Sequence, residues 1–431
     1  MFRKLVTLSE AKRIIQQHFP PKPLEIEKIK LLDAFERILA QDIVSKQNIP
    51  PFSRSTVDGY AVRAKDTIGA EENKPARLRI VGLISAGEKP KTMIKQSEAA
   101  EIVTGAPIPI GANAVVMLEH ADRKNGDLEV FTMVTKSENV MKAGTDIKKG
   151  ETALERGQML KSREIGVLAA MGLAEVKVYA TPHVAVLSSG AEITEPGRKL
   201  QPGKIYDINA YSLSTAVLES GGKPIYLGVF PDSLTEMEKA LKNALTSANV
   251  IVTSGGVSVG PKDVMPRVLN SLGKPGIIVC GIAIKPGKPV TIASAAGKPV
   301  FSLPGHPASA LLVFHLLVRP LIQAMSGRKP TEPLEVEALA GMRMFPAKGR
   351  RTFVMVKLKR DKSSRLVAEP VSAGVSGAIT TLAKADGFVE IGENKQFVEA
   401  KEEVRVQLFD EDMPQLHENI FPQHFLREKN A

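Results

Sequence analysis

The sequence predicts an α/β multidomain protein whose largest domain is a doubly wound, mostly parallel sheet. Between residues 181 and 328, apolar strands alternate with amphipathic helices, which is typical of a parallel sheet covered on both faces. Residues 51–140 and 333–408 instead carry short β-branched runs separated by turn residues, which predicts β-domains. A chain of 431 residues is also too long for one ordinary core.

The first fifty residues predict helices. Thr7 and Glu10 have the spacing of a capping box at the start of a first helix. A second amphipathic stretch covers residues 31–39, with its apolar side chains on one face. We assign residues 1–50, together with 141–180, to an N-terminal helical and linker domain.

An all-β module of residues 51–140 is predicted to be inserted into this domain. Gly, Pro and Asn turns separate its β-branched runs, which cover residues 78–84, 101–103, 114–118 and 128–133. The chain then returns through a helix at about residues 162–171.

The α/β domain is expected to hold the site. Ligands of parallel sheets bind beyond the carboxyl ends of the strands, where this sequence concentrates its Gly, Ser and Asp residues. The domain closes with a helix over about residues 311–325, in which Pro320 predicts a kink. Residues 409–431 are predicted to be a polar tail.

Composition excludes several classes of protein. The formal charge of +11 and the pI near 9.4 suggest nucleic acid, but the basic residues are scattered and aromatic residues make up only 5%. We therefore expect no nucleic-acid partner. Cys280 is the single cysteine, so neither disulfides nor a cysteine metal cluster organises the fold. No apolar run approaches the roughly 20 residues of a membrane helix, and no signal peptide is evident, so we expect a cytoplasmic protein without membrane contact.

Two Gly-containing motifs place carboxylates near turns. In Pro51–Tyr60, Asp58 is either a metal ligand or the residue that holds a turn, and the spacing alone favours the turn. In Thr253–Asp263, three glycines and two serines between a strand and a helix favour anion binding. The alternative is an ordinary strand-to-helix turn with Asp263 as the cap.

Two Pro-Gly motifs carry basic residues. Lys285–Pro289 holds two ammonium groups on a short stiff loop, which favours an anion between them over a solvated basic turn. Leu303–Ala310 begins a helix whose start offers its dipole to an anion. His306 in this motif is interpreted as a structural or hydrogen-bonding residue rather than a catalyst. The residues alone thus predict an α/β enzyme for a phosphorylated or oxyanionic ligand, with carboxylates available for Mg²⁺, and do not identify the substrate.

Taken together, these motifs resemble the MoeA family of molybdopterin molybdenumtransferases, whose animal relative is the E domain of gephyrin. The matching stretches run in family order over about residues 5–408: Ser55–Tyr60, Thr104–Pro107, Gly144–Ile147, Ser189–Glu192, Ile205–Asn209, Gly255–Asp263, Lys285–Pro289 and Leu303–Ser309. Three positions depart from common family residues: Ser53, Lys142 and His306. The resemblance implies an elongated homodimer of four-domain chains with a C-terminal β-barrel-like domain, and a cleft shared between the two chains.

The resemblance also implies roles for particular residues. The molybdate site would comprise Lys285, Lys288, Pro289, Ser309, Arg350 and Ser376, with Arg351 as a rival for Arg350. Catalytic roles would fall to Asp263, Ser258, Asp58, Glu192 and Asp232. The substrate-binding set would be Thr104, Asp146, Gly255, Gly256 and Asp207. Mg²⁺ ligands are expected among Asp58, Glu192 and Asp263.

The implied reaction is Mg²⁺-dependent cleavage of adenylyl-molybdopterin with insertion of molybdate, which gives the molybdenum cofactor and AMP. The implied partners are the upstream adenylyltransferase and the apo-molybdoenzymes that receive the cofactor. Two alternatives remain open: a molybdopterin adenylyltransferase, which the extra β-domains disfavour, and a gephyrin-like scaffold, which the retained Asp263, Lys285 and Lys288 disfavour. Tungstate could replace molybdate, and the sequence does not distinguish these oxyanions.

Overall fold

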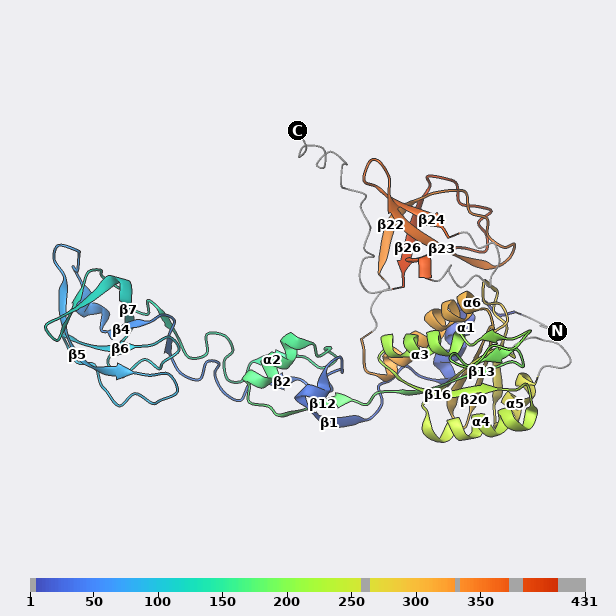
Figure 1. Ribbon diagram of the computed structural model, residues 1–431, viewed down its shortest axis with the longest axis horizontal. Helices are drawn as coiled ribbons and strands as arrows, with labels where there is room; N and C mark the ends of the chain where they lie inside the picture. Colours follow the sequence, from blue (N-terminus) through green and yellow to red (C-terminus); the bar gives the residue numbers. More distant parts are fainter. Residues whose placement is uncertain (1–4, 257–263, 330–333, 372–382, 410–431) are drawn as a thin grey trace. The chain divides into compact units, whose positions relative to one another are not determined.

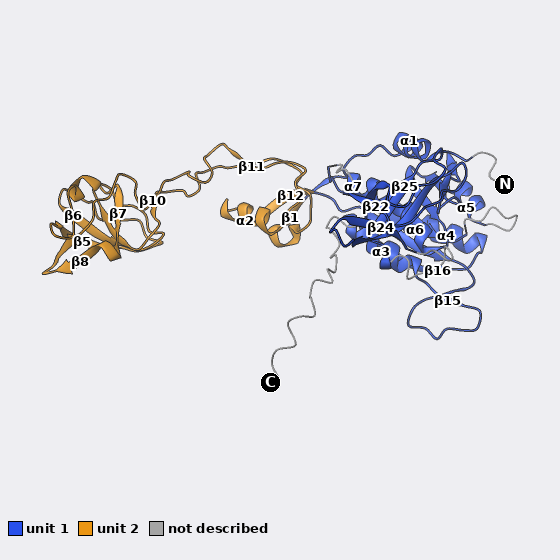
Figure 2. Cartoon of the chain, turned by 90° about the horizontal axis from the view of Figure 1, so that it is seen from above, with its two compact units in different colours: residues 1–27, 179–431 blue, residues 28–178 orange. Residues whose placement is uncertain are grey.

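The computed structural model describes residues 5–256, 264–329, 334–371 and 383–409 (Figure 1). The chain forms two compact units, which are coloured separately in Figure 2: residues 28–178 make one, and residues 1–27 with 179–431 make the other. Ser258, Asp263 and Ser376 lie outside the described residues. We describe each unit by itself.

The β-module in residues 28–178 is a six-stranded sheet with the order β7-β4-β6-β5-β9-β8. Along β4, Tyr60 and Val62 join one apolar cluster while Ala61 joins another, so the alternating pattern buries both faces of the sheet. The β-branched runs predicted here are confirmed as strands. The strands are β4 (Gly59–Val62), β5 (Ala76–Ile84), β6 (Glu98–Ile102), β7 (Ala114–Met117), β8 (Ala121–Lys124) and β9 (Asp127–Val130), with short 3-10 turns η2 (Ala64–Thr67) and η3 (Leu118–His120).

The rest of this unit packs short strands and one helix around Leu39, Leu160 and Leu168. The predicted helix at residues 162–171 is confirmed as α2 (Ser162–Ala170). The strand pairs are β1 (Ile26–Lys30) with β12 (Glu175–Tyr179), β2 (Ile43–Val44) with β11 (Thr152–Leu154), and β3 (Arg54–Ser55) with β10 (Val140–Met141).

The helix predicted over residues 31–39 is wrong. Only η1 (Leu31–Ala34), a single 3-10 turn, forms there. Glu36 then takes a positive φ of 59°, and its backbone N–H donates to the carbonyl of Leu160 at 2.8 Å. Because residues 36–39 bond to a distant segment, the apolar spacing that suggested a helix instead serves a folded loop.

The second unit contains a six-stranded sheet with the order β16-β13-β17-β21-β20-β18. The first four strands run parallel, whereas β20 and β18 are antiparallel additions. This arrangement confirms the predicted fold class of a mostly parallel sheet. Its strands are β13 (His183–Ser189), β16 (Lys223–Phe230), β17 (Val250–Ser254), β18 (Gly276–Cys280), β20 (Thr291–Ala295) and β21 (Lys298–Leu303).

Helices cover both faces of this sheet. Along β13, Val184 and Val186 pack in the cluster that contains α1 and α3, while Ala185 and Leu187 pack with α4 and α5. The capping box predicted for the first helix is present, because Thr7 Oγ1 accepts from Glu10 N–H at 3.1 Å. The helices are α1 (Leu8–His18), α3 (Asn209–Glu219), α4 (Leu234–Ser247) and α5 (Met265–Ser271).

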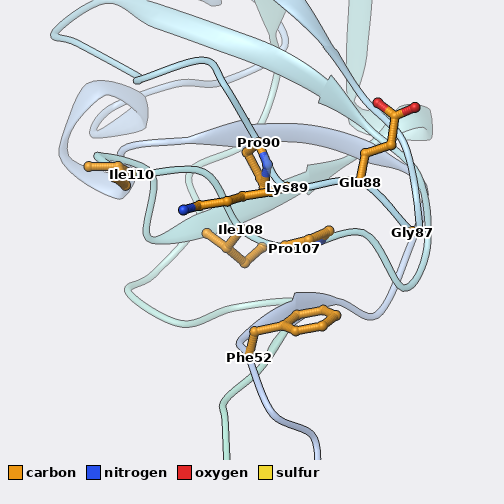
Figure 3. Close-up of a pocket in the computed structure, with 8 residues that line it drawn as sticks. All are labelled: Phe52, Gly87, Glu88, Lys89, Pro90, Pro107, Ile108 and Ile110. Atoms are coloured by element: carbon orange, nitrogen blue, oxygen red, sulfur yellow. The ribbon is translucent and has the colours of Figure 1, made fainter.

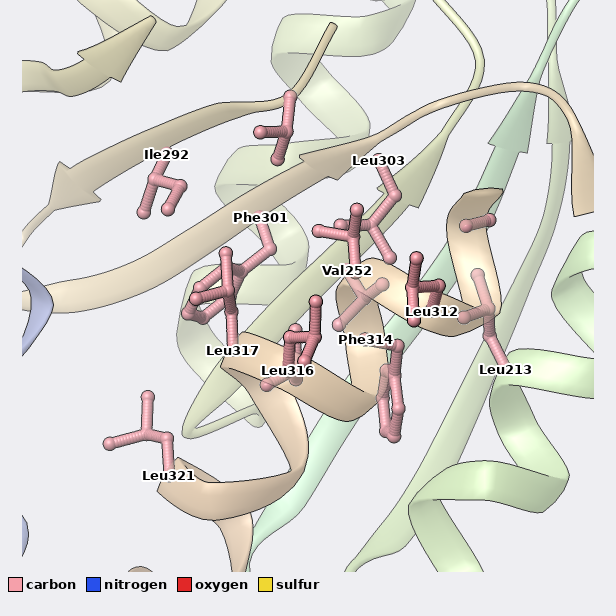
Figure 4. Close-up of a cluster of buried hydrophobic side chains, with 14 of the residues drawn as sticks. Leu213, Val252, Ile292, Phe301, Leu303, Leu312, Phe314, Leu316, Leu317 and Leu321 are labelled. Atoms are coloured by element: carbon pink, nitrogen blue, oxygen red, sulfur yellow. The ribbon is translucent and has the colours of Figure 1, made fainter. Parts of the chain in front are cut away.

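The stretch Pro307–Met325 comprises α6 (Pro307–Val313), the π-helical turn η4 (Phe314–Val318) and α7 (Arg319–Met325). By its length and its mean hydropathy of 1.6 alone, this stretch could cross a membrane. More than half of it is buried, and Leu312, Phe314 and Leu317 pack with Phe301 of the sheet (Figure 4). Core packing therefore explains its apolar composition.

Residues 335–408 form the β-barrel-like domain that the family resemblance implied. Five strands close through an additional β23–β25 pairing, and β19 (Ile284–Lys285) of the α/β domain adds to β23. Met355 faces the α/β core, while its neighbour Val356 faces the barrel interior. The strands are β22 (Glu335–Ala340), β23 (Arg351–Arg360), β24 (Leu366–Pro370), β25 (Gly387–Ile391) and β26 (Glu403–Leu408).

Candidate functional site

A pocket of about 1090 Å³ lies at the carboxyl ends of the parallel strands, where β13 ends at Ser189 and β17 at Ser254. This is the edge at which doubly wound sheets bind ligands. Seven of the predicted site residues line it: Glu192, Asp207, Asp232, Gly255, Gly256, Lys288 and Pro289. The sequence-predicted His306, at the start of α6, also lines it.

Asp207 connects the end of β13 to the start of α3. Its Oδ1 accepts from the Ser188 hydroxyl at 2.9 Å and from the backbone N–H of Ala210 at 3.1 Å. A carboxylate at this place satisfies a free N–H of the first helical turn and meets the positive end of the helix dipole. The side chain that was predicted to bind substrate is therefore also a helix cap.

Asn209 ties two strand ends together beneath the pocket. Its Nδ2 donates to the Ser254 hydroxyl at 2.6 Å and to the Gly305 carbonyl at 2.7 Å. The carbonyl can only accept, so it fixes the orientation of the amide and leaves Oδ1 on the other side. The pocket wall is thus held together by side-chain bonds between α3, β17 and the loop after β21.

Three buried polar atoms in this wall have no hydrogen-bond partner among the described residues: Ser189 Oγ, Asp207 Oδ2 and Asn209 Oδ1. Their residues are each more than nine-tenths buried. Buried polar groups are normally paired, so the wall retains hydrogen-bonding capacity that a polar ligand or ordered water can use.

The Gly255-Gly256 loop requires glycine. Gly255 has a φ of +92°, and a Cβ there would lie 2.2 Å from the Ser189 carbonyl oxygen. Gly256 has a φ of +65°, with a Cβ position 2.9 Å from Ser189 Oγ. The absence of side chains lets the two loops approach each other and leaves the backbone accessible from the pocket.

The predicted molybdate residues separate in the structure. Lys288 and Pro289 line the pocket, whereas Lys285 is exposed in β19, where it pairs with Thr352 of β23. Ser309 is 5% exposed within α6 and does not line the pocket.

Arg350 and Arg351, the two rival arginines, have different environments. Arg351 forms ion pairs with Glu390 at 3.0 Å and with Glu393 at 3.1 Å. Arg350 has no carboxylate partner within the described part of the chain. An arginine already paired with two carboxylates has less charge to offer an oxyanion, so Arg350 is the better candidate.

The other predicted residues that the structure describes, Asp58, Thr104 and Asp146, lie in the unit of residues 28–178. Asp58 Oδ1 accepts from the Thr104 backbone N–H at 2.6 Å and from its hydroxyl at 2.9 Å. These bonds, the backbone one first, lower the pKa of Asp58 below its ordinary value. Asp58 therefore holds the turn at Thr104, as its spacing favoured, while Asp146 is exposed.

A second pocket, of about 400 Å³, lies in the β-module and contains none of the predicted residues. Figure 3 shows Phe52 and Ile108 within it and Lys89 on the loop across from them. Its lining is Phe52, Gly87, Glu88, Lys89, Pro90, Pro107, Ile108 and Ile110.

No three His, Cys, Asp or Glu side chains gather as a metal site in the ranges that the structure describes. The sequence analysis names no role for Ser188, Ser189 or Asn209, although all three line the main pocket. The signal that could have found Ser188 and Ser189 was their position, because they end a predicted strand at this edge of the sheet.

Comparison with known proteins covers nearly the whole chain. Residues 6–172 match the MoeA N-terminal region (domain I and II), 185–324 a probable molybdopterin binding domain, and 337–409 the MoeA C-terminal region (domain IV).

Individual relatives agree with these matches. The molybdopterin molybdenumtransferase of Haemophilus influenzae is 34% identical over 94% of this chain and 99% of its own length. That of Bacillus subtilis is 33% identical over 92% of each chain. Two solved molybdopterin biosynthesis MoeA proteins from Pyrococcus horikoshii have TM-scores of 0.81 and 0.75, with 40% and 29% identity, and cover 94% of this chain and all of their own. The chain therefore belongs to the MoeA family.

Proposed function

We propose that this protein is a molybdopterin molybdenumtransferase that cleaves adenylyl-molybdopterin and inserts molybdate, which releases AMP and the molybdenum cofactor. The observation that carries the proposal is the main pocket, where carboxylates, a glycine loop and Lys288 meet at the carboxyl edge of the sheet. The names of the relatives supply the substrate. The protein is accordingly an enzyme, a transferase of molybdenum cofactor synthesis.

Different groups are proposed to bind molybdate and to act on the pyrophosphate link. Lys288 attracts the tetrahedral dianion molybdate, and Arg350 is the candidate to join it from the barrel. The Gly255-Gly256 backbone lies beside the pyrophosphate link, and Asp263 acts in its cleavage. Holding molybdate beside the dithiolene makes insertion effectively intramolecular, which supplies much of the rate.

Mg²⁺ is proposed as the resident metal. Glu192, Asp207 and Asp232 provide the carboxylate oxygens that Mg²⁺ prefers, and Asp207 Oδ2 is unpaired among the described residues. Mg²⁺ usually takes only one or two protein carboxylates together with substrate phosphates, so the absence of a three-residue cluster among the described residues is compatible with it. When bound, Mg²⁺ neutralises charge on the pyrophosphate oxygens.

The assembly is proposed to be a cytoplasmic homodimer that receives its substrate from the adenylyltransferase and passes the product to apo-molybdoenzymes. The alternative of a stand-alone adenylyltransferase is disfavoured because the family matches include both β-rich regions. A pure scaffold is disfavoured because Lys288 and the glycine loop share one pocket.

The test is AMP release and cofactor loading from adenylyl-molybdopterin, Mg²⁺ and molybdate or tungstate. Lys288→Ala should need about ten- to a hundredfold more molybdate, since a hydrogen bond to a charged group contributes roughly 1.5–3 kcal/mol. Excess molybdate should rescue Lys288→Ala but not Asp263→Asn. No AMP release by the wild-type protein would refute the proposed reaction. If Lys288→Ala loses pterin binding but keeps the wild-type molybdate dependence, the molybdate and pterin subsites have been assigned the wrong way round.

A further inference from the structure

The loop between β14 (Ile193–Thr194) and β15 (Ile205–Tyr206) contains two copies of one turn. Glu195–Arg198 and Gln201–Lys204 both have Pro in the second and Gly in the third position. Gly197 and Gly203 have φ values of +87° and +79°, as type II turns require. The backbone N–H of the fourth residue donates to the first carbonyl at 3.3 Å in the first turn and 3.1 Å in the second. Each turn therefore ends in a basic residue.

Both ends of this loop are fixed to the main pocket. β14 and β15 pair in parallel, and Asp207 N–H donates to the Thr194 carbonyl at 2.8 Å. The Tyr206 hydroxyl donates to the Arg198 carbonyl at 3.1 Å across the loop. Figure 2 shows the loop projecting from its unit beside β15. The basic side chains are thus held by a tethered loop, whose base is the wall that contains Asp207.

The loop lines a neighbouring pocket of about 670 Å³, which we call the loop pocket. This pocket shares Gly190 and Ile193 with the main pocket, so one bound molecule can extend from one into the other. Its far wall is apolar and consists of Val229, Phe230 and Pro231.

The two neighbouring pockets have opposite charge. Among the described residues, the main pocket is lined by three carboxylates and one lysine, whereas the loop pocket is lined by Arg198, Lys199, Lys204 and a single carboxylate, Glu195. Glu195 pairs with Arg198 at 2.9 Å. Lys199 and Lys204 have no carboxylate partner within the described residues, so their charge is available to an anion.

We propose that the loop pocket binds a nucleoside monophosphate, with the phosphate at Lys199 and Lys204 and the base against Val229–Pro231. This inference rests on the proposed function, in which it would hold the AMP half of the substrate while the pterin half occupies the main pocket. An apolar wall opposite two ammonium groups matches a molecule with a flat base at one end and a phosphate at the other.

The test is AMP binding to the full chain by calorimetry, with no turnover needed. The double variant Lys199→Ala/Lys204→Ala should bind AMP about three- to thirtyfold more weakly, the range for two exposed ion pairs, and should lose most of the salt dependence. Its control is Lys239→Ala/Lys242→Ala on α4, which removes the same charge elsewhere and should bind AMP normally. Molybdate dependence should stay unchanged in both.

The outcomes separate this inference from the proposed function. Unchanged AMP binding in Lys199→Ala/Lys204→Ala would overturn the subsite even if the wild-type protein turns over its substrate. Equal affinity for inorganic phosphate and AMP would overturn the role of the apolar wall. The variant could bind AMP more weakly while the wild-type protein releases no AMP from adenylyl-molybdopterin. That result would support the AMP subsite and refute the proposed reaction.

Discussion

Gly287 lies where the basic turn meets the core, and replacing it with alanine should damage both stability and molybdate use. Its φ is +102°, and an added Cβ would lie 2.5 Å from Val313 Cγ2 and 3.1 Å from Ile284 Cδ1. The unfavourable φ costs roughly 1–2 kcal/mol for a residue with a Cβ. Overpacking adds roughly 1–3 kcal/mol, because Val313 is fully buried and cannot move freely. We expect a loss of about 2–5 kcal/mol for Gly287→Ala.

The matched control is Gly297→Ala in the turn between β20 and β21. Gly297 has a φ of +74°, but a Cβ there meets nothing within 4 Å, so only the backbone term of about 1–2 kcal/mol applies. Both variants are compared by urea denaturation, where a lower midpoint at an unchanged slope reports lost stability. Only Gly287→Ala should also need more molybdate, because its neighbour Lys288 lines the pocket. Equal destabilisation of the two variants would show that contact with Val313 has no effect and would refute the reasoning.

Three further predictions concern pH, the arginines and assembly. Burial, with Arg319 and then Lys12 adding to it, lowers the pKa of His315 to about 4. Between pH 4 and 6.5 the unfolded chain therefore binds more protons than the folded chain. Up to about 3 kcal/mol of the folding stability present above pH 6.5 is lost as the pH falls through this range. Urea denaturation at several pH values should show a smaller loss of stability for His315→Gln than for the wild-type protein. Arg350→Ala should raise the molybdate concentration needed for half-maximal insertion about tenfold. Arg351→Ala should mainly lower the melting temperature, because this variant leaves Glu390 and Glu393 unpaired. The reverse result would exchange the roles of the two arginines. Sedimentation equilibrium should give a dimer of the 46.5 kDa chain, and a fully active monomer would contradict this.

The fold could be predicted wherever short-range patterns determine it. The capping box at Thr7 and Glu10 fixes the start of α1 through contacts within four residues. The alternation along β13, which sends Val184 to one core and Leu187 to the other, follows from the period of a strand. Residues 31–39 had an equally good helical pattern, yet Glu36 bonds to Leu160, more than a hundred positions away. Such a contact leaves no mark in the local sequence.

The site residues, too, could be predicted only where they belong to a local sequence pattern. Gly255, Gly256 and Asp207 were found because they belong to motifs at strand ends, where the fold class itself predicts a ligand edge. Asn209 was missed because its importance lies in a bond to Ser254, 45 residues away in the sequence. The sequence predicts that Lys285 and Lys288 act on one anion, because each lysine directly precedes a proline in the same short turn. The separation of their environments depends on a strand pairing with the barrel, which the local sequence does not specify.

That pairing also explains how the C-terminal barrel can contribute to a site in the α/β domain. Ile284 is opposite Arg351 and Lys285 is opposite Thr352, and the Arg351 N–H donates to the Ala283 carbonyl at 3.0 Å. Arg350 therefore immediately precedes β23, whose first residues pair with the segment that leads into Lys288. The backbone register therefore keeps Arg350 close to the segment that leads into the basic turn. A shift of β23 by one residue would place Arg351, with its two carboxylate partners, at that position. The register between β19 and β23 thus makes Arg350, rather than Arg351 with its two carboxylate partners, the residue just before the pairing with Ile284.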